Sequence, residues 1–430
     1  MGATILRACG VVAIALALSL SAVGCVPITG GGGTDADLVA VLPALDHQTF
    51  MQQRAALLPW LNSEHLPYEL VTLEDILAGR DPSTLTAEDV RVYLREHFTA
   101  RPSTEARPRY LALFAPPSAT YVPAGTPYAV IPRFTVDVGG NAFESDLPFE
   151  FPSPTTIDGG DGVVDPSDLN LAEPTFDVFR IPVTGVGDMQ SFVARHNEFM
   201  AAPYRNDATL VAGEFGLRPG DSSAVQCLNA ANLAPLTRHV LKVFDSTAGG
   251  CAPDILTSPS GPRLGTVLAD AGSPFQGGTI VDVSHGSPAA IYAASSTNVT
   301  FANLSTGDVP NILTSRLNVF ISIACDNDAA NGTTANLAEA MYEQASVAVI
   351  SATTQVAPVG VADTLYAEVD SVKALFDKQE TLLQNLHTFR ADYYNRFVLP
   401  ATGVARTLLW TNLLAVDLVG DGLLTVAQQP

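Results

Sequence analysis

Short apolar segments, each a few residues long, alternate with longer segments of helical periodicity along most of the chain. Strands without a polar face must be buried on both sides, as in parallel sheets that carry helices on each face. The sequence therefore predicts an α/β fold with parallel sheets and helices on both faces. The predicted strands cover 38–42, 68–72, 110–114, 179–183, 209–213, 279–283, 318–323, 347–350 and 423–426.

The helices are predicted from apolar stripes and from capping residues. Thr86 precedes one of them and Asp89 follows three residues later, a spacing typical of a capping box at a helix start. Pro, Gly and Asp are frequent in 115–175, where little periodicity is visible. The other predicted helices cover 50–61, 188–200 and 232–244, and a long one carries Leu365, Val369, Val372, Phe376 and Leu383 on one stripe.

The chain is strongly acidic, with 44 Asp and Glu residues against 22 Lys and Arg residues. This balance argues against nucleic acid and anionic lipid surfaces as partners, because both repel negative charge. Apart from its N-terminal leader the chain has roughly 400 residues, which exceeds one ordinary domain. We expect two packed subdomains, an N-terminal one over 37–205 and a second over 206–430.

The N-terminus is predicted to be a signal peptide over 1–24, because one basic residue precedes an apolar run too short to cross a bilayer. Small residues at 21–24 stand directly before Cys25, as lipoprotein signal peptidase requires. We expect a lipid on Cys25 and a Gly-rich tether over 25–36. An ordinary cleavage site with an incidental cysteine is the alternative. No later segment is long and apolar enough to span a membrane.

Reactive side chains follow two of the predicted strands in the second half. The strand 279–283 is followed by Ser284-His285-Gly286, and the strand 318–323 by Ala324-Cys325. In parallel sheets the chemistry collects where the strands end, so His285 and Cys325 can face one substrate if the strands are neighbours. A thiolate is the nucleophilic form of cysteine, and an imidazole favours its formation. The N–H groups of Gly286 and Cys325 could hold a developing oxyanion.

An apolar strand ending in His-Gly, followed by another ending in Ala-Cys, resembles the caspase, legumain and gingipain clan of cysteine peptidases. His285-Gly286-Ser287 is similar to the His-Gly-Ser of the gingipain family. The similarity to the gingipain family continues after the cysteine, at 337–342, 347–354 and 418–422, although Gly422 replaces the family's Pro. Upstream, 70–76, 110–114 and 180–183 resemble the first half of the same domain, so the likeness spans about 37–426.

The resemblance implies a caspase-like catalytic domain of two parallel-sheet α/β subdomains. It also implies a cysteine endopeptidase that hydrolyses protein or peptide substrates through a Cys-His dyad and uses no cofactor in the chemistry. We expect a monomer. In this clan the primary specificity pocket is built by three loops, which here cover 287–296, 326–334 and 353–360. Asp326 and Asp328 would either favour a basic residue before the scissile bond or face solvent.

Three other readings stay open at this point. The protein could be a catalytically inactive member of the family that acts as a surface binding module. His285 and Cys325 could be structural, since buried Cys and strand-terminal His residues are common in cores. A serine hydrolase is the least favoured, because the sequence has no Gly-x-Ser-x-Gly motif.

Val26, directly after the anchor cysteine, favours sorting to the outer membrane or cell surface over retention at the inner membrane.

The remaining cysteines and several acidic residues give further expectations. Cys227 and Cys251 are expected to form a disulfide in an oxidising compartment, with two buried thiols as the alternative, and Cys325 is then the odd thiol. Asp282, three residues before His285, is expected to point to the opposite face of the strand and to be structural, with orientation of His285 through backbone neighbours as the alternative. An oxygen-rich loop is a possible structural calcium site, with a solvated acidic loop as the alternative, and holds Asp158, Asp161, Asp165 and Asp168. No metal-ligand spacing links the other histidines of the mature chain, at positions 47, 65, 97, 196, 239 and 387.

Overall fold

The structure of the chain is a computed structural model in which one compact unit, 34–430, contains every described residue. The described residues are 36–99, 109–118, 130–151, 163–164, 169, 175–212, 237–243, 255–257, 263–271, 273, 277–294, 300–312, 316–322, 324–325, 327–329, 335–354, 374–375, 378 and 380–426. Cys25, Cys227, Cys251 and the four aspartates of the predicted calcium loop lie outside these ranges.

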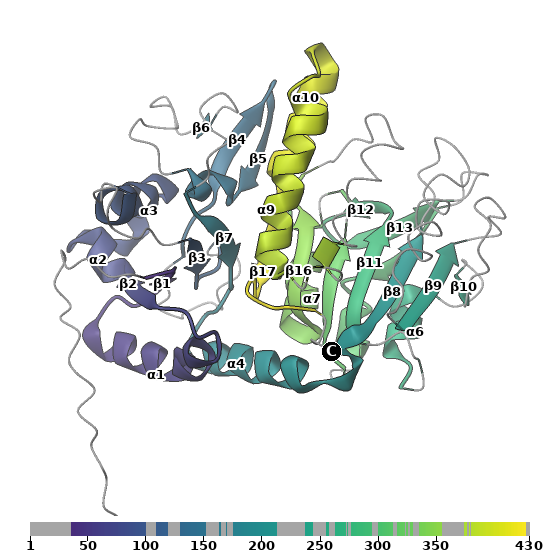
Figure 1. Cartoon of the computed structure of the whole chain (residues 1–430), viewed down its shortest axis with the longest axis horizontal. Coiled ribbons are helices and arrows are strands. Elements are labelled where there is room, and N and C mark those ends of the chain that lie inside the picture. The colour runs from purple at the N-terminus through teal and green to yellow at the C-terminus, as the bar shows by residue number, and fades with distance from the viewer. Residues whose placement is uncertain are drawn as a thin grey trace, which may run out of the picture. The chain divides into compact units, whose positions relative to one another are not determined.

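An 11-stranded sheet runs through the unit in the order β10-β9-β8-β11-β15-β16-β17-β7-β3-β1-β2 (Figure 1). Its N-terminal strands are β1 (Leu38–Leu42), β2 (Tyr68–Thr72), β3 (Tyr110–Leu113) and β7 (Asp177–Arg180). The others are β8 (Asp207–Ala212), β9 (Thr237–Val243), β10 (Ile255–Thr257), β11 (Gly278–Val283), β15 (Asn318–Ser322), β16 (Ser346–Ala352) and β17 (Val416–Gly420).

The sheet consists of two parallel blocks joined by β17. Within each block every neighbouring pair is parallel. β17 pairs antiparallel with β16 over five residue pairs and parallel with β7 through the single pair Val419↔Arg180. The predicted α/β class is therefore confirmed, and the strands of the two predicted subdomains lie in one continuous sheet.

Helices cover both faces of the sheet, as the apolar strands predict. Alternate residues of β1 belong to different cores, with Leu38, Ala40 and Leu42 in one and Val39 and Val41 in the other. The first core also holds residues of α1 (His47–Ser63), α4 (Val186–Ala201), α6 (Leu264–Ala269) and α7 (Leu337–Gln344). The second holds residues of α2 (Leu73–Leu77), α3 (Ala87–Leu94) and α10 (Gly403–Ala415).

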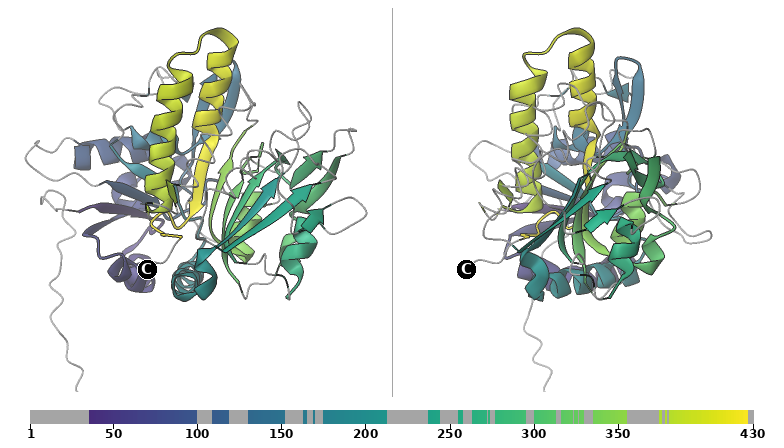
Figure 2. Two further views of the ribbon diagram at one scale, coloured as in Figure 1. Left: turned by 45° about the vertical axis from the view of Figure 1, so that its right-hand side comes forward. Right: turned by 90° about the vertical axis from the view of Figure 1, so that its right-hand side faces the viewer.

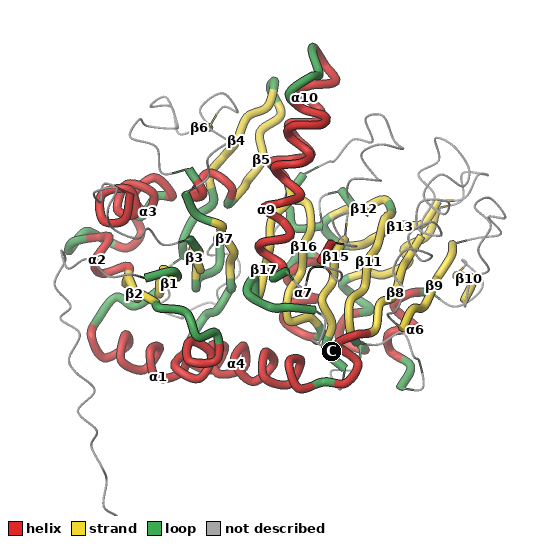
Figure 3. Tube along the Cα trace, viewed as in Figure 1, coloured by secondary structure: helices red, strands yellow, loops and turns green. Residues whose placement is uncertain are grey.

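The remaining elements are short or lie beside the sheet. α9 (Leu382–Tyr393) and α10 run next to each other (Figure 2). Figure 3 separates helices, strands and loops along the same trace. Two small sheets have the orders β12-β13-β14, with β12 (His285–Ser287), β13 (Ala290–Ala294) and β14 (Thr300–Ser305), and β5-β4-β6, with β4 (Phe134–Val138), β5 (Asn141–Ser145) and β6 (Val163–Val164). The short helical turns are η1 (Pro82–Thr84), η2 (Arg95–Thr99), η4 (Leu147–Glu150), η6 (Pro203–Asn206), η7 (Val309–Asn311) and η8 (Tyr394–Val398).

Three sequence-based expectations are wrong. The predicted helix over 232–244 contains strand β9, which pairs with β8 in a parallel register of six residue pairs. The long helix that was to include Leu383 does not continue there, because Thr381 caps the start of a separate helix, α9. The predicted strand over 423–426 is not formed, since the carbonyls of Gly422 and Leu424 accept hydrogen bonds from the first N–H groups of α9. In the described ranges no helix is both long and apolar enough to cross a membrane.

Candidate active site

His285 and Cys325 follow two neighbouring strands at equivalent positions. β11 and β15 are parallel partners, and their last pair is Asp282↔Ser322. His285 and Cys325 each lie three residues beyond that pair. The structure therefore places both residues at the same edge of the sheet, just beyond the ends of adjacent strands. Both are half-buried, and Cys325 is a thiol rather than half of a disulfide.

Gly286 lies directly against the backbone of Cys325. A Cβ atom built at Gly286 would be 2.1 Å from the Cys325 carbonyl oxygen and 2.7 Å from its nitrogen. Real Cβ atoms do not approach backbone this closely, so only glycine fits here without a shift. The contact brings the segment that carries His285 against the peptide that carries Cys325.

Asn327 holds the two segments together, a role that the sequence analysis missed. Its buried side-chain amide donates to the Ser287 carbonyl oxygen at 2.8 Å and to that of Ala290 at 3.3 Å. Its Oδ1 accepts a hydrogen bond from the Ser322 hydroxyl at 2.8 Å. The loop after Cys325 is thus fixed to β15 and to the turn after His285. The only sequence signal was a polar residue soon after the strand-terminal cysteine.

Asp282 is fully buried beneath this edge of the sheet. Its Oδ2 lies 2.7 Å from the Ser284 hydroxyl and 3.4 Å from the Ser322 hydroxyl. The Ser322 hydroxyl also donates to Asn327 Oδ1 at 2.8 Å, so its longer contact with Asp282 is the weaker of the two hydrogen bonds. Burial raises the pKa of Asp282 to about 7, against which the hydrogen bonds from Ser284 and Ser322 act to lower it. The expected structural role is consistent with this geometry.

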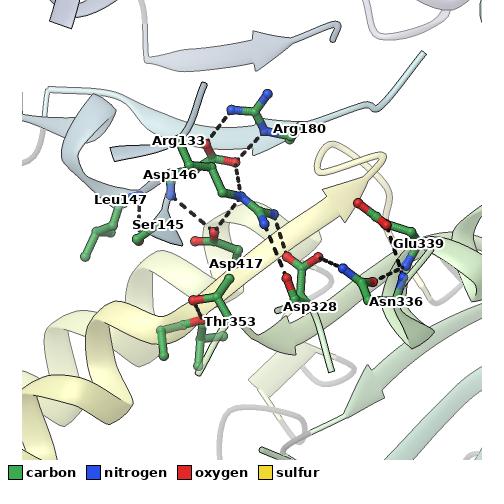
Figure 4. A network of polar contacts seen from close by, with 12 residues as sticks. Arg133, Ser145, Asp146, Leu147, Arg180, Asp328, Asn336, Glu339, Thr353 and Asp417 are labelled. Atoms are coloured by element: carbon green, nitrogen blue, oxygen red, sulfur yellow. Dashed lines mark hydrogen bonds and ion pairs between the residues drawn. The ribbon is translucent and has the colours of Figure 1, made fainter. Parts of the chain in front are cut away.

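The position of Asp328 contradicts both expected roles, which were recognition of a basic substrate residue and exposure to solvent. Its side chain is buried and forms an ion pair with Arg133, whose Nη2 lies 2.5 Å from Asp328 Oδ2 (Figure 4). It neither faces solvent nor remains available to bind a basic substrate residue. The reason is long-range, because Arg133 precedes β4, on the other side of the β17 junction. Asp326 and most of the predicted specificity loops lie outside the described residues.

Arg133 is the centre of a buried polar cluster next to the Cys325 loop. Its Nε lies 3.5 Å from Asp146 and 3.5 Å from Asp417, and Arg180 forms a two-pronged ion pair with Asp146 at 2.7 and 2.5 Å. Burial raises the pKa of Asp417 to about 7, and the charge of Asp146 adds to that shift. Burial acts to raise the pKa of Asp146 as well, but the two arginines hold it below its usual value. The cluster ties the first block of strands to β17 and to the loop after Cys325.

These elements define a caspase-like α/β domain, and comparison with solved structures agrees. The chain is similar to a crystal structure of the Arg-specific cysteine proteinase gingipain R, with a TM-score of 0.62 and 13% identity over 92% of this chain and 80% of the other. It is also similar to a solved structure described as a protease, with a TM-score of 0.61 and 13% identity over 91% and 78% of the two chains. No family model matches the sequence, and no curated protein is significantly similar to it. The gingipain-type fold is thereby confirmed.

Proposed function

We propose that the protein is a cysteine endopeptidase in which His285 and Cys325 form the catalytic dyad. His285 takes the thiol proton, and the Cys325 thiolate attacks the carbonyl carbon of a peptide bond. The N–H groups of Gly286 and Cys325 stabilise the oxyanion, and His285 then protonates the leaving amine. A water molecule, deprotonated by the same imidazole, releases the acyl group from the thioester.

One observation supports this proposal above the others. The parallel register of β11 and β15 puts His285 and Cys325 at matching positions, and Gly286 packs on the Cys325 peptide. A close approach of backbone at this point serves an oxyanion site, whereas a core His or Cys residue would not require it. The Asn327 hydrogen bonds then hold both segments in place, as catalytic geometry demands.

The dyad is tested with Cys325→Ala and His285→Ala in the full chain. We expect each variant to lose peptide hydrolysis while its melting temperature stays within a few degrees of the parent. Labelling by a thiol-reactive peptide probe should occur in the parent and be lost in Cys325→Ala. Full turnover in Cys325→Ala would contradict the proposal. A folded parent that neither cleaves a diverse peptide library nor takes up the probe would favour the inactive binding module instead.

We further propose that the protein is exported and held at the outer membrane or cell surface by a lipid on Cys25. The support is in the sequence, where small residues stand directly before Cys25 and a Gly-rich stretch follows it. Such a stretch gives the folded unit freedom to move over the membrane surface. Substrates would then be proteins or peptides in the cell envelope or outside the cell.

A further inference from the structure

Three titratable side chains that are distant in sequence meet at the junction of the two strand blocks. Glu64 follows α1 directly, His196 lies on α4, and Asp421 follows β17. One potential ligand atom from each lies within 4.8 Å of the others. His196 and Asp421 are buried, and the side chain of Glu64 is 14% exposed. The proposed peptidase mechanism uses none of them.

The contacts of Asp421 determine which nitrogen of His196 carries hydrogen. Asp421 accepts hydrogen bonds from Trp60 Nε1 at 3.2 Å and from the Leu423 N–H at 3.1 Å. Its Oδ2 also lies 2.5 Å from His196 Nδ1. An ionised carboxylate only accepts, so Nδ1 must be the donor. In the neutral ring the lone pair is then on Nε2, the nitrogen that faces Glu64.

His196 Nε2 and Glu64 Oε1 are 3.6 Å apart. A proton shared between an imidazole and a carboxylate would draw the two atoms to about 2.7–2.9 Å. A metal ion bound about 2.0–2.2 Å from each atom, with tetrahedral or slightly wider angles, holds them about 3.3–3.6 Å apart. The observed separation agrees with the metal and is too long for the shared proton.

We propose that His196 Nε2 and the Glu64 carboxylate bind a divalent transition-metal ion of the Zn²⁺ type. Asp421 positions the imidazole by accepting from Nδ1, as carboxylates commonly do for metal-bound histidines. Water completes the coordination through the exposed side of Glu64. A nitrogen and a carboxylate favour Zn²⁺ over Mg²⁺ or Ca²⁺, which prefer oxygen ligands alone.

The charges around the site agree with a bound cation. Two carboxylates, Glu64 and Asp421, lie 3.6 and 2.5 Å from the ring nitrogens of a single imidazole, and this excess of negative charge attracts a cation. Both proposed ligands, His196 and Glu64, bind a metal ion only in their deprotonated forms, so zinc affinity should fall as pH decreases.

The test is calorimetric titration of ZnCl₂ into the full chain after removal of metals by a chelator. The Cys325→Ala background removes the thiol with which His285 could otherwise form a competing zinc site, and the result does not depend on peptidase activity. We expect one saturable zinc site, and no comparable binding of MgCl₂ or CaCl₂. Glu64→Gln and His196→Gln should each weaken zinc binding at least tenfold.

His65→Asn is the matched control, because His65 neighbours Glu64, is exposed and has a φ of 54°, which asparagine tolerates. It should bind zinc like the parent. Since His196 is buried, circular dichroism must first show that His196→Gln folds. If that variant does not fold, the test rests on zinc binding by Glu64→Gln. Absence of zinc binding, or binding that Glu64→Gln leaves unchanged, would overturn the proposal.

Discussion

The hydrogen atom on the Gly286 Cα occupies the space into which any larger side chain would have to project. The atoms in the way are the oxygen and nitrogen of the Cys325 peptide, which cannot rotate aside as a side chain can. A substituent at 286 must therefore push the His285 segment and the Cys325 segment apart.

We predict that Gly286→Ala lowers kcat/KM for peptide hydrolysis on the order of 10²-fold, because a displacement near 1 Å disturbs reacting groups by about that factor. Gly187→Ala is the control, since Gly187 lies exposed in α4 with no atom within 4 Å of the added Cβ. It should keep full activity and gain slightly in stability from better helix propensity. Unchanged activity in Gly286→Ala would show that the close approach has no catalytic consequence.

Asp282 should make the stability of the protein depend on pH. Its pKa is about 7 in the folded protein, above its usual value of 3.8, because of burial. The folded state then holds a proton that the unfolded state releases, so stability falls as pH rises from about 4 to about 7. An asparagine side chain at this position would donate and accept as the neutral acid does, without ionising.

We therefore predict that Asp282→Asn is at least as stable as the parent at pH 8 and has a flatter stability profile between pH 4 and pH 7. Urea denaturation at a series of pH values measures both quantities. Ser284→Ala is a useful companion, because it removes a donor to Asp282 and leaves the titration in place. A large loss of stability in Asp282→Asn at pH 8 would mean that the ionised carboxylate is required.

The sequence could indicate His285 and Cys325 because both follow apolar strands directly, and local patterns are visible in a single chain. It could not indicate Asn327 or Arg133 in the same way. The role of Asn327 depends on carbonyl groups at Ser287 and Ala290, and that of Arg133 on a carboxylate 195 positions later. Such contacts depend on how the strands assemble, which periodicity does not encode.

Arg133 links elements of both strand blocks through charges that are shielded from water. It contacts Asp328 after β15, Asp417 in β17 and Asp146 after β5. Burial raises the pKa of Asp328, and Arg133 acts in the opposite direction through its charge and its hydrogen bond. Without the guanidinium, Asp328 and Asp417 would lose their main compensating charge.

We predict that Arg133→Met lowers the free energy of unfolding by about 3–5 kcal/mol at pH 8, the usual cost of removing one partner of a buried ion pair. The loss should shrink toward pH 5, because the remaining carboxyl groups can then bind protons. Arg109→Met is the control, since Arg109 is 55% exposed and lies 3.5 Å from Asp177, a pair expected to contribute at most about 1 kcal/mol. Equal effects of the two variants in urea denaturation would contradict the prediction.

The wrong predictions of helices and strands share a cause. Residues 237–243 have no strong strand pattern of their own and become β9 through pairing with β8. Residues 423–426 are apolar enough for a strand, yet their backbone is used to cap α9. In both places a distant partner decides the local structure, whereas β1, β3, β11 and β15 lie close to where their apolar runs predict.

The location of the protein in the cell would depend on Cys25, which precedes the folded unit. With a net charge of −22, the chain should be repelled by anionic membrane surfaces. We predict that Cys25→Ala moves the protein from the membrane fraction to the soluble fraction. Mass spectrometry of the parent should find a thioether-linked diacylglycerol on Cys25. A mature parent that is cut elsewhere and has an unmodified Cys25 would contradict this.

The order of strands in the sheet has a consequence for how the chain is made. β17 is the last of the described sheet strands along the sequence, yet it lies between β16 and β7. A chain emerges with its N-terminal side first, so the residues of both parallel blocks are available before residues 416–420. Until then β7 and β16 are open edges, which favour aggregation and attract holding chaperones. A nascent chain that stops before 416 would consist of two unjoined blocks, and degradation or chaperone capture is its expected fate.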